Sequence, residues 1–334
     1  MRSKTEIYQK YYNVQTYDEA RALYDTIHSQ TIPLSSATKL QLPYEAASHP
    51  GIPSFDEIDK GMKENHFKLR FHGSEAEDLL YLQANSQVRT PKVYAVFTRD
   101  EEWGLATYMV TELIEGERFS GKLYMSLSDE GREKLLARLC EQLRLLRATP
   151  SEGYYGRVHN QGWSPLATPF HGGGLEMYGP YKTYEDFVSA LNACIEIVAA
   201  LCSGHDSNFY PEQELFLSGI KDSLAKSKGS RPTFTHIDPA GQNIIVRKLQ
   251  GSEQGAEGWE VTFIDWSDSG WYPAWMQAWT CTERIHLFDG YGAPHYNEES
   301  RQIRQKVLQS FEDPYSEEVE LYKKLGEEAD YSII

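Results

Sequence analysis

Along the first third of the chain, apolar and polar residues alternate in short runs that predict a small sheet with one helix. Residues 66–71 alternate strictly, which is the period of a half-buried strand. The next range, 74–85, carries leucines at helical spacing and predicts a helix with Ser74 as its N-cap. Ranges 93–98 and 105–114 then predict two antiparallel strands joined by a charged turn.

The pattern becomes helical after a break at 115–116. Leucines recur every three or four positions across 128–147, and 183–201 carries a second apolar stripe, so both ranges predict amphipathic helices. Two short strands are expected at 243–246 and 259–264. A helix rich in tryptophan and an acidic helical tail are expected to complete the chain.

This order of elements predicts an α+β protein. A small antiparallel-sheet lobe, a connector and a larger, mainly helical lobe are the parts of a protein-kinase-like two-lobed fold, although pattern alone fits several other α+β folds equally well. We expect an N-terminal helical extension over 1–50, with a helix at 17–28, a small lobe over 51–114 and a large lobe over 115–334.

Composition narrows the choice of partners. With 334 residues, of which 40% are hydrophobic and 25% charged, the chain is long enough for two packed lobes. The formal net charge of −16 argues against nucleic acid or an anionic membrane as a partner, since both repel an acidic surface. It is compatible with a cationic, amine-bearing small molecule, although most acidic surfaces serve only solubility.

The cysteines and the N-terminus predict a cytoplasmic protein. The chain has four cysteines, Cys140, Cys194, Cys202 and Cys281. They form no C-x-x-C pair, so we expect thiols in a reducing compartment rather than disulfides or a zinc site. The N-terminal residues lack the apolar core of a signal peptide, and the best apolar run, 195–202, is too short for a membrane span. The oligomeric state stays open.

The residues that point to chemistry lie in the segment THIDPAGQNIIV and in VTFIDW, which follows it. His236, Asp238 and Asn243 have the spacing H-x-D-x-x-x-x-N, on one loop before a predicted strand. Phosphoryl transfer needs a carboxylate that accepts the proton of the attacking hydroxyl, and oxygen ligands that hold Mg²⁺ against the phosphates. We expect Asp238 to be the general base and His236 to hold the loop by bonding backbone. Asn243 and Asp265 are the expected Mg²⁺ ligands.

In combination, these segments resemble the aminoglycoside phosphotransferase family, in particular its fungal-type branch of small-molecule kinases. The family pattern H-G-D-x-x-x-x-N-I-L-V is similar to 236–246, and I-D-W-x-x-x-G-W-Y-P is similar to 264–273. In the small lobe, 75–76 and 91–94 resemble a stretch of the form E-A-x-x-L…P-K-V-Y, and 111–116 resembles the hinge M-E-y-I-x-G.

The resemblance runs from about residue 66 to about residue 280 and implies that ATP is held between the lobes. The adenine would lie against the backbone of three hinge residues, Glu112, Leu113 and Ile114. A lysine of the small lobe would hold the α- and β-phosphates and pair with a helix glutamate, for which Glu75 is the candidate. Lys68 and Arg70 point the same way on the predicted strand, and we prefer Lys68 because a compact ammonium suits a phosphate.

The sequence departs from the family pattern in two places. Ile237 stands where the family has glycine, and a β-branched residue there is expected to shift the loop or lower activity if the glycine serves an unusual backbone conformation. No clear glycine-rich loop precedes Lys68, and no G-x-x-x-x-G-K-[ST] segment supports a P-loop kinase.

Two readings of function therefore stand beside each other. The first is an active kinase that phosphorylates a small-molecule hydroxyl, and the second is a nucleotide-binding scaffold with weak or no turnover. The retained trio of Asp238, Asn243 and Asp265 favours the enzyme. A protein kinase is disfavoured, because Ile-Asp-Trp stands in place of Asp-Phe-Gly and no A-P-E segment follows.

Other conspicuous residues have structural explanations. The glycines after His171 predict a surface loop near the substrate opening. Four tryptophans at short spacing predict core packing: Trp266, Trp271, Trp275 and Trp279. Three acidic residues could form a pocket for an amine-bearing acceptor or simply be solvated: Asp268, Glu283 and Asp289. The motif does not identify the acceptor.

Overall fold

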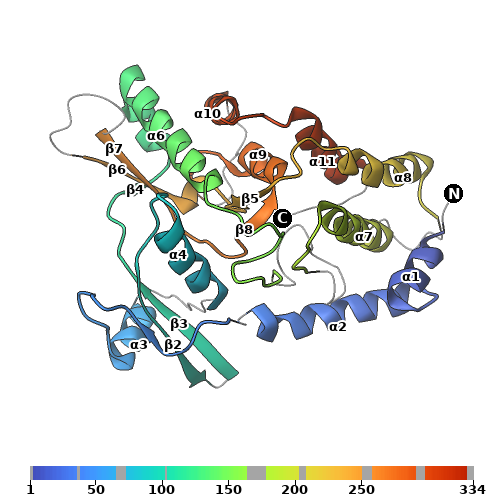
Figure 1. Cartoon of the computed structure of the whole chain (residues 1–334), viewed down its shortest axis with the longest axis horizontal. Helices are drawn as coiled ribbons and strands as arrows, with labels where there is room; N and C mark the ends of the chain where they lie inside the picture. The colour runs from blue at the N-terminus through green and yellow to red at the C-terminus, as the bar shows by residue number, and fades with distance from the viewer. Residues whose placement is uncertain are drawn as a thin grey trace.

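A small antiparallel sheet with helices beside it forms the small lobe in the computed structural model of the protein (Figure 1). The structure describes residues 3–35, 38–64, 73–101, 104–163, 178–202, 208–249, 258–290 and 298–328. The sheet has the order β1-β2-β3, from the strands β1 (Tyr44–Glu45), β2 (Val93–Glu101) and β3 (Gly104–Thr111). Two helices accompany it, α3 (Phe55–Glu64) and α4 (Gly73–Asn85).

Each helix reaches the sheet through specific contacts. Helix α4 packs against β2 and β3 and buries Leu79 and Leu82. Helix α3 places the ring of Phe55 edge-on to the rings of Phe97 and Tyr108, at centroid distances of 5.2 and 6.1 Å. The alternating pattern of β2 and β3 thus gives the sheet apolar residues for its helices.

The large lobe is mainly helical. Its helices are α5 (Gly121–Ser126), α6 (Asp129–Arg147), α7 (Tyr184–Cys202), α8 (Pro211–Ala225), α9 (Ala274–Arg284), α10 (Glu298–Gln309) and α11 (Ser316–Glu328). The lobe also contains two small antiparallel sheets. One has the order β4-β6-β7, from β4 (Glu117–Arg118), β6 (Ile244–Lys248) and β7 (Trp259–Phe263). The other pairs β5 (Pro232–Thr235) with β8 (Gly270–Pro273).

The core of this lobe explains the helical periodicities. Leucines of α6 at positions 135, 139, 143 and 146 are fully or almost fully buried, and Ser128 caps the helix by accepting from the Gly131 amide. The tryptophans 266, 271, 275 and 279 are buried as predicted. Only the last two lie on a helix, α9, because Trp271 belongs to β8 and Trp266 precedes it. The four tryptophans are buried because each has a large apolar surface, and not because they share one face of a helix.

The N-terminal segment contacts both lobes. It forms α1 (Lys4–Tyr12) and α2 (Tyr17–Ser35), and α2 runs from α1 back toward the small lobe (Figure 1). Helix α1 packs on α7, where Tyr11 donates to the buried carboxylate of Glu196 at 2.6 Å. Beyond α2, the Lys39 amide donates to Glu77 of α4 at 2.7 Å. The division of the chain at 50 and 114 stays a prediction.

Most predicted elements are confirmed within a residue or two, and three differ. Strand β2 continues to Glu101, past the predicted end at residue 98. Helix α2 continues beyond the predicted end at residue 28. Strand β3 ends at Thr111 rather than at 114, because its last ladder partner is Val93 and only Glu112 bonds back, to the Lys92 carbonyl. The predicted strand at 66–71 and the loop after His171 lie outside the described residues. None of the four cysteines, all in described segments, forms a disulfide.

No helix in the described segments is long and apolar enough to cross a membrane.

Candidate active site

The predicted catalytic loop leaves β5 and enters β6 through a short 3₁₀ turn, η2 (Gly241–Asn243). His236 is fully buried at its start. Its amide donates to Oε1 of Gln277 at 2.9 Å, and its Nε2 lies 3.1 Å from the carbonyl oxygen of Ile264. Because a carbonyl only accepts, Nε2 carries the proton. Burial lowers the pKa of His236 despite the nearby carboxylates of Asp238 and Asp265, which favours the neutral ring.

The side chains of the predicted base and the predicted amide ligand touch each other. Nδ2 of Asn243 donates to Oδ2 of Asp238 at 2.9 Å and to the Asp238 carbonyl at 3.1 Å. Asp238 is half-buried. With its nitrogen bonded to Asp238, the oxygen of the Asn243 amide is the atom suited to bind a cation.

Asp265 reaches the same place from β7. The Ile264 amide donates to the Asn243 carbonyl at 2.9 Å, which sets Asp265 beside the loop. Asp265 is exposed and has φ +60°, a left-handed conformation that aspartate tolerates better than most residues. Asp238 and Asn243 thus touch, and the Asn243–Ile264 backbone bond places Asp265 next in the chain to a residue bonded to this loop. The carboxylates of Asp238 and Asp265 both lie close enough to His236 for their charges to act on its pKa.

Glu75 of the small lobe also points to this place. Its Oε1 accepts from the Trp266 amide at 3.0 Å, across 191 positions of the sequence. Burial first, and the charge of Asp265 second, raise the pKa of Glu75 to about 7. Glu75 therefore contacts the segment that carries Asp265, whereas its predicted partner Lys68 lies outside the described residues.

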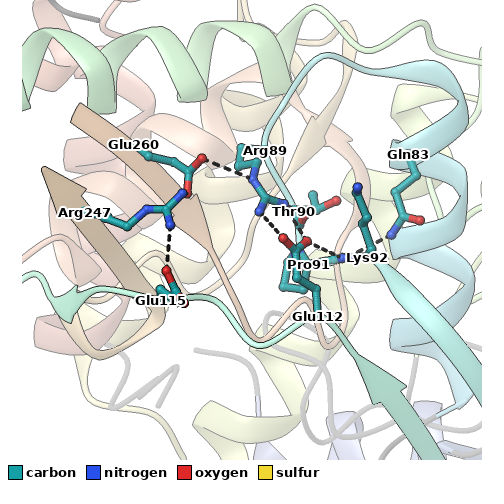
Figure 2. A network of polar contacts seen from close by, with 9 residues as sticks. All are labelled: Gln83, Arg89, Thr90, Pro91, Lys92, Glu112, Glu115, Arg247 and Glu260. Carbon is teal, nitrogen blue, oxygen red and sulfur yellow. Dashed lines mark hydrogen bonds and ion pairs between the residues drawn. The ribbon is translucent and has the colours of Figure 1, made fainter. Parts of the chain in front are cut away.

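The three hinge residues are placed between the lobes. Glu112, Leu113 and Ile114 lie between the end of β3 and the start of β4, so they link the small sheet to the large lobe. The side chain of Leu113 is 88% exposed. The carboxylate of Glu112 points to Arg89 rather than to open solvent (Figure 2).

The oxygen ligands suit Mg²⁺. Mg²⁺ is commonly held by one or two protein oxygens together with substrate phosphates and water, and Asn243 with Asp265 offers that set. Within the described segments, no group of three or more His, Cys, Asp or Glu side chains is arranged to hold a metal by itself.

Several supporting residues could not be identified from the sequence. Gln277 holds both the amide and, at 3.3 Å, the carbonyl of His236 from α9. Gly241 lies so close to the backbone of Phe119 and His286 that no side chain fits at this position.

Ile237 keeps an ordinary negative φ and is buried in the core, so this loop does not need the family's glycine for its backbone.

Two of the three acidic residues considered for an amine pocket, Asp289 and Asp268, have neighbours that the described segments show. Asp289 accepts from the Gly121 amide at the start of α5, at 2.9 Å. The pKa values of Asp78 and Tyr272 are raised mainly by burial, and the negative charge of Asp268 raises both further. An amine-binding role for these residues stays untested.

Comparison with known proteins was made on the sequence and on the fold. Residues 72–298 match the model of a family described as the phosphotransferase enzyme family, which is more than half of the chain. No protein with a curated description matches significantly.

Three solved structures show a distant likeness to this chain. A ternary complex of streptomycin, ATP and APH(2'')-IIa is 13% identical, covers 90% of this chain and 88% of that chain, and has a TM-score of 0.44. A thermostable mutant of APH(4)-Ia with AMP-PNP and hygromycin B is 14% identical over 77% and 76%, with a TM-score of 0.44. An ethanolamine kinase from Plasmodium vivax is 12% identical over 76% and 65%, with a TM-score of 0.36. At these scores, no likeness bears on activity or substrate.

Proposed function

Because the chain belongs to the phosphotransferase enzyme family, we propose that it transfers the γ-phosphate of ATP to a hydroxyl group of a small molecule. The observation that carries this proposal is the contact of the Asp238 carboxylate with the Asn243 amide, beside the segment of Asp265. These are the groups that phosphoryl transfer requires at one point.

In the proposed reaction, Asp238 accepts the proton of the acceptor hydroxyl as its oxygen attacks the γ-phosphorus. The bond from that phosphorus to the β-bridging oxygen breaks, and ADP leaves. Asn243 positions the Asp238 carboxylate through its Nδ2 and, with Asp265, would hold Mg²⁺. When bound, Mg²⁺ neutralises charge on the phosphate oxygens. His236 fixes the loop through Gln277 and Ile264, so its role is positional.

The nucleotide would lie between the lobes. In this proposal the adenine contacts the backbone of Leu113 and Ile114, Lys68 binds the phosphates, and Glu75 orients that lysine. The acceptor in this proposal is a hydroxyl compound that can carry amines, with which the net charge of −16 is compatible. The reaction is proposed to take place in the cytoplasm.

Substitution of the base tests the proposal. Asp238→Asn preserves shape and removes the proton acceptor, so we expect turnover to fall by about a hundredfold or more while ATP still raises the melting temperature. Turnover is measured as ADP formation across a library of hydroxyl compounds. Asp222→Asn, an exposed carboxylate of α8, is the matched control and should leave turnover unchanged.

Two outcomes contradict the proposal in different ways. Unchanged turnover in Asp238→Asn removes Asp238 from the mechanism. In the second outcome, the wild type binds ATP and yet forms no ADP with any acceptor of a broad library. That result supports the alternative of a nucleotide-binding scaffold.

A further inference from the structure

The hinge between the lobes lies outside the strands and is joined to its surroundings by a backbone hydrogen bond and by side chains. Residues 112–116 connect β3 to β4, and neither Leu113 nor Ile114 belongs to a strand. The first residue of the stretch bonds through its amide to the Lys92 carbonyl at 2.8 Å. A glutamate stands on each side of Leu113 and Ile114, at positions 112 and 115.

The first glutamate is gripped by Arg89. The two Nη atoms of Arg89 donate to the two carboxylate oxygens of Glu112, at 2.6 and 3.0 Å (Figure 2). Burial alone would raise the pKa of Glu112, but the hydrogen bonds from Arg89 and from the Lys92 amide outweigh it, and the pKa is lowered. Such two-pronged charged contacts are among the strongest hydrogen bonds in proteins.

Arg89 is itself fixed to the large lobe. Its amide donates to Oε1 of the buried Gln142, on α6, at 2.7 Å. Its Nε lies 3.7 Å from a carboxylate oxygen of Glu260, on β7. The arginine precedes β2 of the small lobe, so it ties the small lobe, the hinge and the large lobe together.

A second arginine completes the arrangement from β6. Arg247 donates to Glu115 at 2.9 Å and to Glu260 at 3.1 Å. Five side chains of alternating charge thus join both ends of the hinge to the β6–β7 hairpin. We call this set the hinge network: Glu112, Arg89, Glu260, Arg247 and Glu115 (Figure 2).

The ion pairs of the hinge network differ in how much they stabilise the hinge. The side chains of Arg89 and Glu112 are 25% and 24% exposed, which reduces screening by water, and their contact is two-pronged. Glu115 is 73% exposed and Arg247 is 39% exposed, so their pair contributes little by itself. Arg89 is the residue on which the position of the hinge depends most.

We propose that the hinge network positions the backbone of Leu113 and Ile114 for the adenine base, with Arg89 as the principal positioning residue. This inference rests on the proposed function, because it needs a nucleotide at the hinge. Arg89 touches neither the phosphates nor the reacting atoms in this account. Its loss therefore weakens nucleotide binding and leaves the chemical step nearly intact.

The test compares Arg89→Met with Arg301→Met in the full-length protein. Arg301 makes an equally two-pronged contact with Glu298, at 2.6 and 2.8 Å, but within α10 and away from the hinge. We expect Arg89→Met to raise the Kd for ADP and the KM for ATP by about tenfold or more, with kcat changed less than about threefold. Arg301→Met should match the wild type.

Two additions separate positioning from general damage. Glu112→Gln keeps the size of the side chain and removes its charge, so it should shift the Kd for ADP in the same direction even if Arg89→Met folds poorly. Arg89→Lys keeps the charge without the fork and should restore only part of the affinity. Hydrogen exchange should show faster exchange of the amides at 113–115 in Arg89→Met than in Arg301→Met.

The outcomes distinguish this inference from the proposed function. If the wild type binds ADP and both Arg89→Met and Glu112→Gln bind it equally well, the inference fails and the proposed function stands. If the wild type binds no adenine nucleotide, both fail. A fall in kcat with unchanged KM would assign Arg89 to the chemical step and overturn a positioning role.

Discussion

We predict that Gly241→Ala, which adds a single methyl group, strongly lowers kcat. A Cβ built there would lie 2.7 Å from the carbonyl oxygen of Phe119 and 2.8 Å from the amide nitrogen of Phe288, and closer still to the carbonyl oxygen of His286. All three neighbours are backbone atoms. The segments that carry them are bonded to each other, since the Phe288 amide donates to the Phe119 carbonyl at 2.9 Å.

The required movement can be worked from these distances. Favourable contacts of carbon need about 3.5–4.0 Å, so the 3₁₀ turn must move by on the order of 1 Å. Asn243 is the last residue of that turn and holds Asp238. A misplacement of about 1 Å can cost about a hundredfold in rate, and overpacking costs about 1–3 kcal/mol of stability.

The assay compares Gly241→Ala with Gly219→Ala. A Cβ on Gly219, in α8, has no neighbour within 4 Å, so alanine there should stabilise the helix by up to about 1 kcal/mol. For Gly241→Ala we expect kcat to fall by about a hundredfold while the protein remains folded and binds ATP. Activity equal to that of Gly219→Ala would refute the claim that close packing positions the catalytic loop.

Two further predictions concern stability. Arg157 and Glu77 are almost fully buried and joined at 2.9 Å, so Arg157→Met should lower the free energy of unfolding by about 3–5 kcal/mol in urea, and a loss below about 1 kcal/mol would contradict this. Burial alone would raise the pKa of Glu312, but the hydrogen bond from Arg147 lowers it to about 2. Its stabilising contribution is therefore complete above the usual value of 4.5 and is lost as the pH falls toward 2. Glu312→Gln should be less stable than the wild type at pH 6 and equally stable near pH 2, and a difference independent of pH would contradict the linkage.

The sequence was most informative where chemistry is local. The spacing of His236, Asp238 and Asn243 fixes three groups on one loop, and the following hairpin is short enough to bring Asp265 back to it. In the structure Asp238 contacts Asn243, and the residue before Asp265 bonds to the Asn243 backbone, whereas the catalytic roles stay predictions. Glu75 was found through the family resemblance, because periodicity alone does not say what a helix residue meets 191 positions away.

The rest depends on contacts that have no local signal. Gln277 supports His236 from 41 positions away, and nothing in its neighbours marks it. The sequence pattern that predicted β3 continues past the end of the strand. The strand itself ends at Thr111, because its partner strand begins at Val93 and offers no further pairing. Arg89 looks like any surface arginine in the sequence, since only the fold brings Glu112 and Glu260 to it.

The central claim is that Asp265, with Asn243, brings Mg²⁺ to a nucleotide at this loop. Its most direct test is calorimetric titration of ATP into wild type and Asp265→Ala, each with Mg²⁺ and with EDTA. We predict that Mg²⁺ tightens ATP binding in the wild type and makes no difference in Asp265→Ala. Binding that Mg²⁺ tightens equally in both proteins would contradict the account.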